Sequence, residues 1–211
     1  MGVREMPLFP PVVRVLKTAA TALKSAGHIV TEVTTPVGGD YKTVLETYLR
    51  GLALDSNNSA MKPMSDGNEE VLPALTEIVE ALGTLPPPTL GAVWDYNASK
   101  TRIRKAWLYA MSKDNLDIIL CPGAGSPGFL HDTFGMPFYT MIWNLLDVPA
   151  SVVPYLKADK TIDVSEMEGY DPELTDGIPC GIQLVGWSGQ DEEVLMATEV
   201  VADVLHEAGQ A

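Results

Sequence analysis

The sequence has few of the residues that build disulfide frameworks or metal sites. Its 211 residues include 2 cysteines, Cys121 and Cys180, and 3 histidines, at positions 28, 131 and 206. Two cysteines are too few for a disulfide framework, and the histidines lack the close spacing of zinc ligands. We therefore expect no metal site and no cofactor, and a reducing compartment is the simplest environment for the two thiols.

Positive charge is also scarce. The chain has 14 lysines and arginines against 28 aspartates and glutamates, which gives a net charge of −14. Nucleic acids and anionic membranes are bound through clustered Lys and Arg side chains, so this balance argues against both as partners. Long apolar runs are missing too: no stretch reaches the length of a transmembrane helix, and no apolar targeting region follows Met1. These absences predict a cytoplasmic protein.

The composition that is present is typical of a globular protein. Hydrophobic residues make up 46% of the chain, which is enough for a sizeable core. We expect one domain over residues 1–211. Within it, residues 51–88 are rich in loop-forming residues, and residues 157–179 are expected to form an acidic excursion on the surface.

The spacing of apolar residues alternates between that of helices and that of strands. It predicts helices over residues 10–26, 40–54, 69–82, 89–111, 138–147 and 191–208. It predicts strands over residues 28–33, 117–121, 149–154 and 181–185, with loops over residues 55–59, 63–67 and 122–137. This order favours an α/β fold in which helices flank a layered, mostly buried mixed sheet.

The segment Ser59-Ala-Met-Lys62 has the Ser-x-x-Lys spacing of serine–lysine enzymes. It lies between Asn58 and Pro63, where a continuous helix is not expected, and no companion motif follows. Chance is therefore the better explanation of this match.

A glycine-rich segment, Gly123-Ala-Gly-Ser-Pro127, follows the strand predicted at residues 117–121. Such a turn can present backbone N–H groups to a ligand, but it has the spacing of neither a phosphate-binding loop nor a dinucleotide-binding motif. We expect Gly125, Ser126 and the nearby Phe129 to border a substrate pocket. Ser126 would act as a nucleophile only beside a positioned base.

Two further groups are candidates for a site. His131 and Asp132 can act as general acid or base at the rim of a pocket, or Asp132 can cap a turn. Tyr139 and Trp143 are four residues apart, which places them on one face of the predicted helix, and Asn144 follows. Two aromatic rings with one amide suit a largely apolar pocket for a small molecule, and they suit a hydrophobic core equally well.

Several segments of the second half occur together in one known family. They are Asp117-Ile-Ile-Leu-Cys-Pro122, His131-Asp-Thr133, Trp143-Asn-Leu-Leu-Asp-Val-Pro-Ala150, Tyr170-Asp-Pro-Glu173 and Gly181-Ile-Gln-Leu-Val-Gly186. In content and order they resemble the C-terminal portion of the amidase signature family, in particular its fungal acetamidase-like members. The resemblance extends from about residue 7 to near the C-terminus and is weakest between about residues 51 and 80.

The resemblance implies a truncated amidase-signature-like fold without the catalytic segment. Members of this family hydrolyse amides with a Ser–Ser–Lys triad on a Gly/Ser-rich segment that precedes the matched portion, and the present sequence has no such segment. Loss of the nucleophile, the base and the oxyanion donors removes most of the rate acceleration. We therefore expect no autonomous amidase activity, only the scaffold and one wall of a substrate channel.

The resemblance also implies an uncovered surface. In the family the N-terminal half packs on this portion and completes a shared sheet, so an apolar face and a strand edge are expected to be exposed here. A second copy of the chain can cover such a face in a symmetric homodimer, which is the oligomeric state we expect.

Three functions fit these patterns. The first is a small-molecule-binding protein repurposed as a non-hydrolytic enzyme, which uses His131, Asp132 and Tyr139 for a cyclisation, isomerisation or elimination. The second is a non-catalytic pseudoenzyme that binds a ligand or a partner protein. The third is the C-terminal part of an amide hydrolase that needs a separate N-terminal half. The well-patterned pocket segments slightly favour the first.

Overall fold

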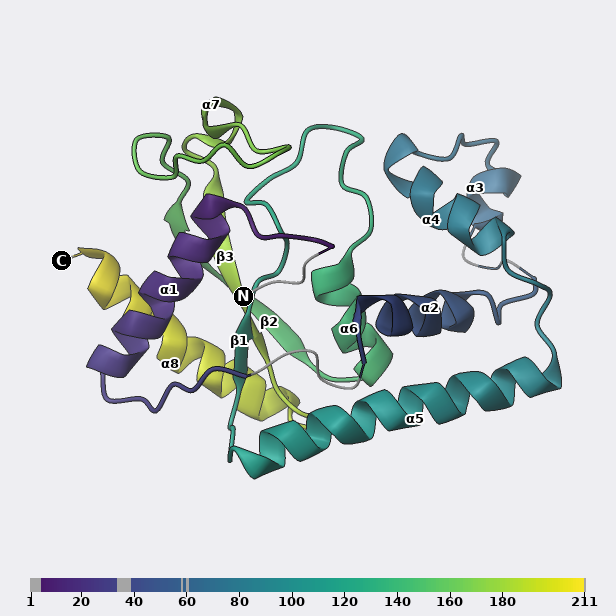
Figure 1. The fold of residues 1–211 in the computed structure, drawn as a ribbon, viewed down its shortest axis with the longest axis horizontal. Helices are drawn as coiled ribbons and strands as arrows, with labels where there is room; N and C mark the ends of the chain where they lie inside the picture. The colour runs from purple at the N-terminus through teal and green to yellow at the C-terminus, as the bar shows by residue number, and fades with distance from the viewer. Residues whose placement is uncertain (1–4, 34–38, 58, 60, 211) are drawn as a thin grey trace.

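A computed structural model describes residues 5–33, 39–57, 59 and 61–210. Along the chain the elements are α1 (Pro10–Ser25), α2 (Tyr41–Leu52), α3 (Lys62–Asp66), α4 (Pro73–Gly83), α5 (Leu90–Lys113), β1 (Ile119–Cys121), α6 (Phe138–Leu146), β2 (Ala150–Lys157), α7 (Pro172–Thr175), β3 (Pro179–Val185) and α8 (Asp191–Gln210). The predicted α/β class, with helices flanking a sheet, is confirmed (Figure 1).

The strands form one small sheet in the order β1-β3-β2. Both described pairings are antiparallel: Cys121 of β1 and Val152 of β2 both lie opposite Gln183 of β3. The register between β2 and β3 is interrupted between Pro154 and Lys157, where Leu156 has a φ of 58°. β3 is therefore the central strand, and β2 is an edge strand with a local irregularity near its end.

Helices α1 and α8 cover one face of this sheet (Figure 1). The apolar stripe of α1 is buried and consists of Pro11, Val12, Val15, Leu16, Ala19 and Leu23. On β2 the alternate residues Val153 and Tyr155 are buried toward these helices, and the hydroxyl of Ser151 shares a hydrogen bond with that of Thr198 on α8. Apolar burial along α1, α8 and the sheet supplies most of the driving force for this layer.

A second layer is built around α6, which contacts α2 and α5. The ring of Trp143 on α6 meets Trp107 on α5 edge to face, with centroids 5.1 Å apart. Phe138, at the start of the same helix, lies 4.6 Å from the ring of Tyr41 on α2. Such aromatic pairs add to the apolar area that the layer buries.

The segment between α2 and the middle of α5 projects away from the sheet (Figure 1). Its helix α4 contains no buried residue, and most of the first half of α5 is exposed. Helices α2 and α5 are in close contact where Gly51 meets the ring of Tyr96. A Cβ on Gly51 would lie 2.7 Å from that ring. This region carries the part of the sequence that was expected to be rich in loops.

Residues 158–178 form the surface excursion, which contains α7. Its two ends meet, since the backbone N–H of Ala158 donates to Ile178 at 2.9 Å and that of Gly177 donates to Ala158 at 2.9 Å. The excursion is fixed to α1 by the ion pair of Arg14 with Asp163.

Three predicted elements differ from the structure. Residues 28–33 pair with no described strand: Ile29 is 95% exposed, and Val30 packs against the core without forming a strand. Part of the loop predicted at residues 63–67 is helix α3, whose first turn accommodates Pro63. The helix predicted from residue 69 begins at Pro73, since proline lacks the N–H of a helix interior.

Candidate functional site

The glycine-rich segment after β1 is a tightly held loop. The carbonyl of Gly125 accepts a hydrogen bond from the N–H of Phe9 at 2.8 Å, and a Cβ on Gly125 would lie 3.3 Å from the carbonyl oxygen of Pro7. Ser126 is buried, and its hydroxyl donates to the carbonyl of Gly128. This hydrogen bond stabilises the turn, and Ser126 is therefore engaged with the backbone of its own loop instead of a catalytic base.

The next part of the loop lies at the surface. His131 and Asp132 are both exposed, and Asp132 adopts a φ of 66°. The hydroxyl of Thr133 donates to the carbonyl of Leu130 at 2.9 Å and caps this turn. Phe129 is 44% exposed, and its ring meets that of Phe134 edge to face with centroids 5.0 Å apart.

The aromatic residues of α6 face inward. Tyr139 and Trp143 share one helical face, as their spacing predicts, and both are buried. The hydroxyl of Tyr139 donates to the backbone carbonyl of Met6, and Trp143 meets Trp107. Asn144 is exposed, so the three residues do not converge on one space. The geometry of Tyr139 and Trp143 matches the core alternative.

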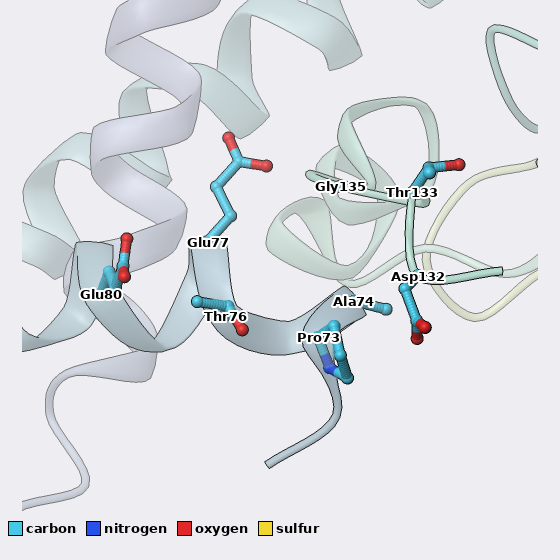
Figure 2. A pocket seen from close by; sticks show the side chains of 8 residues that line it. All are labelled: Pro73, Ala74, Thr76, Glu77, Glu80, Asp132, Thr133 and Gly135. Atoms are coloured by element: carbon cyan, nitrogen blue, oxygen red, sulfur yellow. The ribbon is translucent and has the colours of Figure 1, made fainter. Parts of the chain in front are cut away.

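A shallow cavity of about 390 Å³ lies between α4 and the loop at residues 132–135 (Figure 2). Its lining includes Asp132 and Thr133 from the loop and Glu77 and Glu80 from α4. Figure 2 shows that the carboxylates of Glu77 and Asp132 point in different directions. The cavity thus brings Asp132 beside α4, while Tyr139 is not among its lining residues.

The residues of the Ser-x-x-Lys match have separate partners. The hydroxyl of Ser59 donates to Asp55 at 2.6 Å, whereas Nζ of Lys62 pairs with Asp66 at 2.9 Å. A serine–lysine dyad requires the two side chains to face each other. The interpretation of this match as chance agrees with that geometry.

A partly buried polar cluster lies beside the end of β1 and includes Trp143, which sequence reasoning considered for a substrate pocket. Burial raises the pKa of the Cys121 thiol to about 12, against an opposing contribution from the neighbouring Trp143 side chain. Gln183, opposite Cys121 in the register, is buried. In the described part of the chain, the Oε1 atom of Gln183 and the indole N–H of Trp143 have no hydrogen-bond partner of ordinary geometry. The one signal in the sequence was a glutamine within an apolar strand.

Sequence reasoning also missed Glu77 and Glu80, which line the cavity with Asp132. They fall in the region between residues 51 and 88, which was expected to be rich in loops. Among the described residues, no group of three or more His, Cys, Asp or Glu side chains is arranged to hold a metal ion. Nor does that part of the chain contain a helix with the length and hydropathy of a membrane span.

Comparison with known proteins gives consistent matches along the chain. A family model described as Amidase matches residues 3–195. A protein of Gibberella moniliformis named "Amidase" is 38% identical over 205 residues, which are 95% of this chain and 37% of that protein. An "Acetamidase" of Emericella nidulans is 30% identical over a region that includes 93% of this chain and 38% of that protein. The chain therefore spans less than two-fifths of these relatives.

The fold agrees with the same comparison. A solved structure named "Fatty acid amide hydrolase" superimposes with a TM-score of 0.86 and 26% identity, over 97% of this chain and 38% of that one. A second solved structure, a 6-aminohexanoate cyclic dimer hydrolase complexed with substrate, has a TM-score of 0.59 over 97% of this chain. Nearly all of the present fold thus recurs inside larger chains, which is consistent with a C-terminal portion of such proteins.

Proposed function

This chain belongs to the amidase family, and from that membership we propose that it supplies the C-terminal part of an amide hydrolase whose nucleophile and base lie in another part of the complete fold. One observation carries the proposal. A solved amide hydrolase superimposes on 97% of this chain with a TM-score of 0.86, and the superimposed region is only 38% of that hydrolase. Because this portion of the fold is preserved so completely, a function within a complete amidase fold is supported. The names of its relatives suggest carboxylic amides as the substrate class.

In this proposal the chain contributes one wall of the substrate channel. The loop after β1 presents Phe129 to solvent, and the core positions that loop through the hydrogen bond from Phe9 to Gly125. An exposed aromatic side chain on a rigidly held loop suits contact with the apolar part of a substrate. Gly125, Ser126 and Phe129 are the residues that we propose lie nearest to it, and the two free thiols are compatible with a cytosolic location.

Co-expression tests the proposal directly. The part of the Gibberella moniliformis relative that this chain does not match would be produced as a separate polypeptide together with this chain. We expect ammonia release from acetamide, or from a fatty acid amide, only when both polypeptides are present. Hydrolysis by this chain alone, or no hydrolysis by a complex that does form, would contradict the proposal.

The cavity beside Asp132 favours a second candidate, the non-hydrolytic small-molecule enzyme. Its volume of about 390 Å³ is within the usual range for small ligands. In that function Asp132 and His131 would exchange protons with the ligand, and Tyr139, Trp143 and Asn144 would have to move to reach it. Turnover by the isolated chain that is lost in Asp132→Asn would support this candidate. Binding that survives the substitution, without turnover, would support a pseudoenzyme.

A further inference from the structure

We infer that a second cavity, between α1 and α8, is a binding site for a small monocarboxylate, which is held by the Nζ atom of Lys17 and the hydroxyl of Tyr155. The cavity has a volume of about 360 Å³. Its lining residues are Lys17, Thr18, Thr21, Ala22, Tyr155 and Ala208. None of them belongs to the loop after β1. The inference therefore goes beyond the proposed function and does not depend on it.

Two helices and one strand form the walls of this cavity. Helices α1 and α8 pack on one face of the sheet (Figure 1), and both contact β2. Residues at alternate positions of a strand point to opposite faces, so Tyr155 shares with Val153 the face under these helices. The ring of Tyr155 reaches the last turn of α8, because a Cβ on Gly209 would lie 3.9 Å from its Cε2 atom. The short side chains of Ala22 and Ala208 leave space beside this ring.

The Tyr155 hydroxyl is the feature that points to a ligand. Tyr155 is 7% exposed, and no group in the described part of the chain forms a hydrogen bond with its hydroxyl. The other buried tyrosines of that part, Tyr139 and Tyr170, donate to backbone carbonyls, as buried tyrosines usually do. Burial raises the pKa of the Tyr155 hydroxyl, which therefore stays protonated at neutral pH as a donor. Because Tyr155 lines the cavity, a ligand there can accept this hydrogen bond.

Lys17 supplies the positive charge of the site. Its side chain is exposed on α1 and forms no ion pair with a described residue, whereas Lys62, for example, pairs with a carboxylate. The hydroxyls of Thr18 and Thr21 each donate to a backbone carbonyl of α1 at 2.9 Å. The Nζ atom of Lys17 and the hydroxyl of Tyr155 are therefore the side-chain donors that remain for a ligand in this cavity.

Two donors and one positive charge select the class of ligand. A carboxylate has two oxygens, so that one can accept from Lys17 and the other from Tyr155, and an ionised acceptor forms the stronger hydrogen bonds. A dianion such as phosphate is disfavoured, because the site has a single cation and the last turn of α8 carries the negative end of the helix dipole. Ala22 and Ala208 offer apolar contact to a short alkyl chain.

Butyrate is a suitable probe, and butyramide, which has nearly the same shape without the charge, is its matched control. Each compound would be added to the ¹⁵N-labelled full chain up to about 50 mM, which covers dissociation constants in the millimolar range. Amide chemical shifts would be followed by NMR. We expect butyrate to cause saturable shifts at residues 17–22, 155 and 208, and butyramide to bind at least about fivefold more weakly.

Three substitutions test the two donors. Tyr155→Phe should weaken butyrate binding about tenfold, because a hydrogen bond to a charged group is lost, and Lys17→Met should weaken it about fivefold. Lys24→Met removes the same charge from the last turn of α1, outside the cavity, and should leave binding within about twofold. Tyr155→Phe should also leave the urea midpoint unchanged, since its hydroxyl has no partner in the described part of the chain.

Saturable shifts with butyrate that Tyr155→Phe and Lys17→Met both weaken would support the inference. Equal binding of butyrate and butyramide, binding that survives Tyr155→Phe, or no saturable shift at all would overturn it. Binding of inorganic phosphate as tight as that of butyrate would overturn the assignment to monocarboxylates. A lower urea midpoint of Tyr155→Phe would mean that the hydroxyl serves folding, which also contradicts the inference. The titration uses this chain alone, so its failure leaves the test of amide hydrolysis by co-expression unaffected.

Discussion

Arg14 and Asp163 are 149 residues apart in the sequence and form a two-point ion pair in the structure. The Nε atom of Arg14 donates to one carboxylate oxygen at 2.6 Å, and its Nη2 atom donates to the other at 2.7 Å. Asp163 is only 2% exposed, and its carboxylate also accepts the backbone N–H of Asp159 at 2.9 Å. The pair fixes the excursion at residues 158–178 to α1.

Removal of the Arg14 side chain should lower the free energy of unfolding substantially. Arg14→Ala leaves the Asp163 carboxylate buried without its cation, which typically costs about 3–5 kcal/mol. Arg14→Lys should recover only part of this loss, because an ammonium group cannot donate from two fixed points. Urea unfolding followed by circular dichroism measures the free energy of unfolding. Lys160→Ala, which removes exposed ion pairs with Glu173 and Asp176 from the same excursion, is the control and should leave the midpoint nearly unchanged.

The same pair predicts a pH dependence. Burial alone would raise the pKa of Asp163, but the hydrogen bonds from Arg14 and Asp159 and the charge of Arg14 outweigh it, and the pKa is lowered. The unfolded chain therefore takes up a proton at a higher pH than the folded one, near the ordinary value of about 3.9. Stabilisation by Asp163 is complete above that pH and is lost as the pH falls through the lowered folded value.

Urea midpoints of the unaltered chain and of Asp163→Asn between pH 7 and pH 2 test this dependence. The decline should be shallower in the variant, because it lacks one of the carboxylates that must be protonated. Asp40 and Asp159, whose pKa values are lowered by hydrogen bonds from Thr43 and Thr161, contribute to the decline in both proteins. Parallel curves for the two proteins would contradict the role assigned to Asp163.

Two glycines should respond in opposite ways to alanine. A Cβ on Gly186 would lie 2.3 Å from the Cγ2 atom of Val194, whereas one on Gly83 at the end of α4 meets nothing within 4 Å. Gly186→Ala should destabilise the fold by about 1–3 kcal/mol through overpacking. Gly83→Ala should be neutral or stabilise it by up to about 1 kcal/mol, because alanine has the higher helix propensity. Equal thermal midpoints for the two variants would contradict this contrast.

Local signals in the sequence predicted much of this fold. The long helix α5 begins where Thr89 was expected to cap it, and the Thr89 hydroxyl accepts the N–H of Ala92 at 3.1 Å. Short apolar runs located the three described strands, although β2 is buried on one face only and its residues alternate between buried and exposed. The alternation at residues 28–33 was misleading because strand formation also requires a neighbour, which that pattern does not encode.

The candidate site was less predictable, for a physical reason. Helical spacing correctly placed Tyr139 and Trp143 on one face of α6, but spacing does not say what lies opposite. The partners are Met6 and Trp107, which belong to distant segments of the chain. The cavity depends in the same way on Glu77 and Asp132, which only the tertiary fold brings together. Contacts between residues far apart in the chain, such as Arg14 with Asp163, produce no recognisable local pattern in the sequence.

The two thiols should be unreactive in the folded protein. Burial raises the pKa of Cys121 to about 12 and also raises that of Cys180. Since the thiolate is the reactive form, a thiol reagent such as 5,5′-dithiobis(2-nitrobenzoate) at pH 8 should detect no fast-reacting group in the native chain and both groups after denaturation. Ser112→Cys, at an exposed position of α5, supplies a fast-reacting control. Rapid reaction of a native thiol would contradict the raised pKa values of these two groups.

Tyr139→Phe distinguishes a structural from a catalytic hydroxyl. The substitution keeps the buried ring and removes the hydroxyl that donates to the Met6 carbonyl. If the hydroxyl is structural, the free energy of unfolding should fall by about 0.5–1.5 kcal/mol, while hydrolysis by the co-expressed complex should be unchanged. Tyr109→Phe is the matched control and should change neither quantity, because Tyr109 is 69% exposed on α5. Loss of turnover in Tyr139→Phe without a loss of stability would instead mean that the hydroxyl reaches a substrate. That result would place Tyr139 in the hydrolytic site of the assembled complex, and the Met6 carbonyl would then have to release the hydroxyl during the reaction.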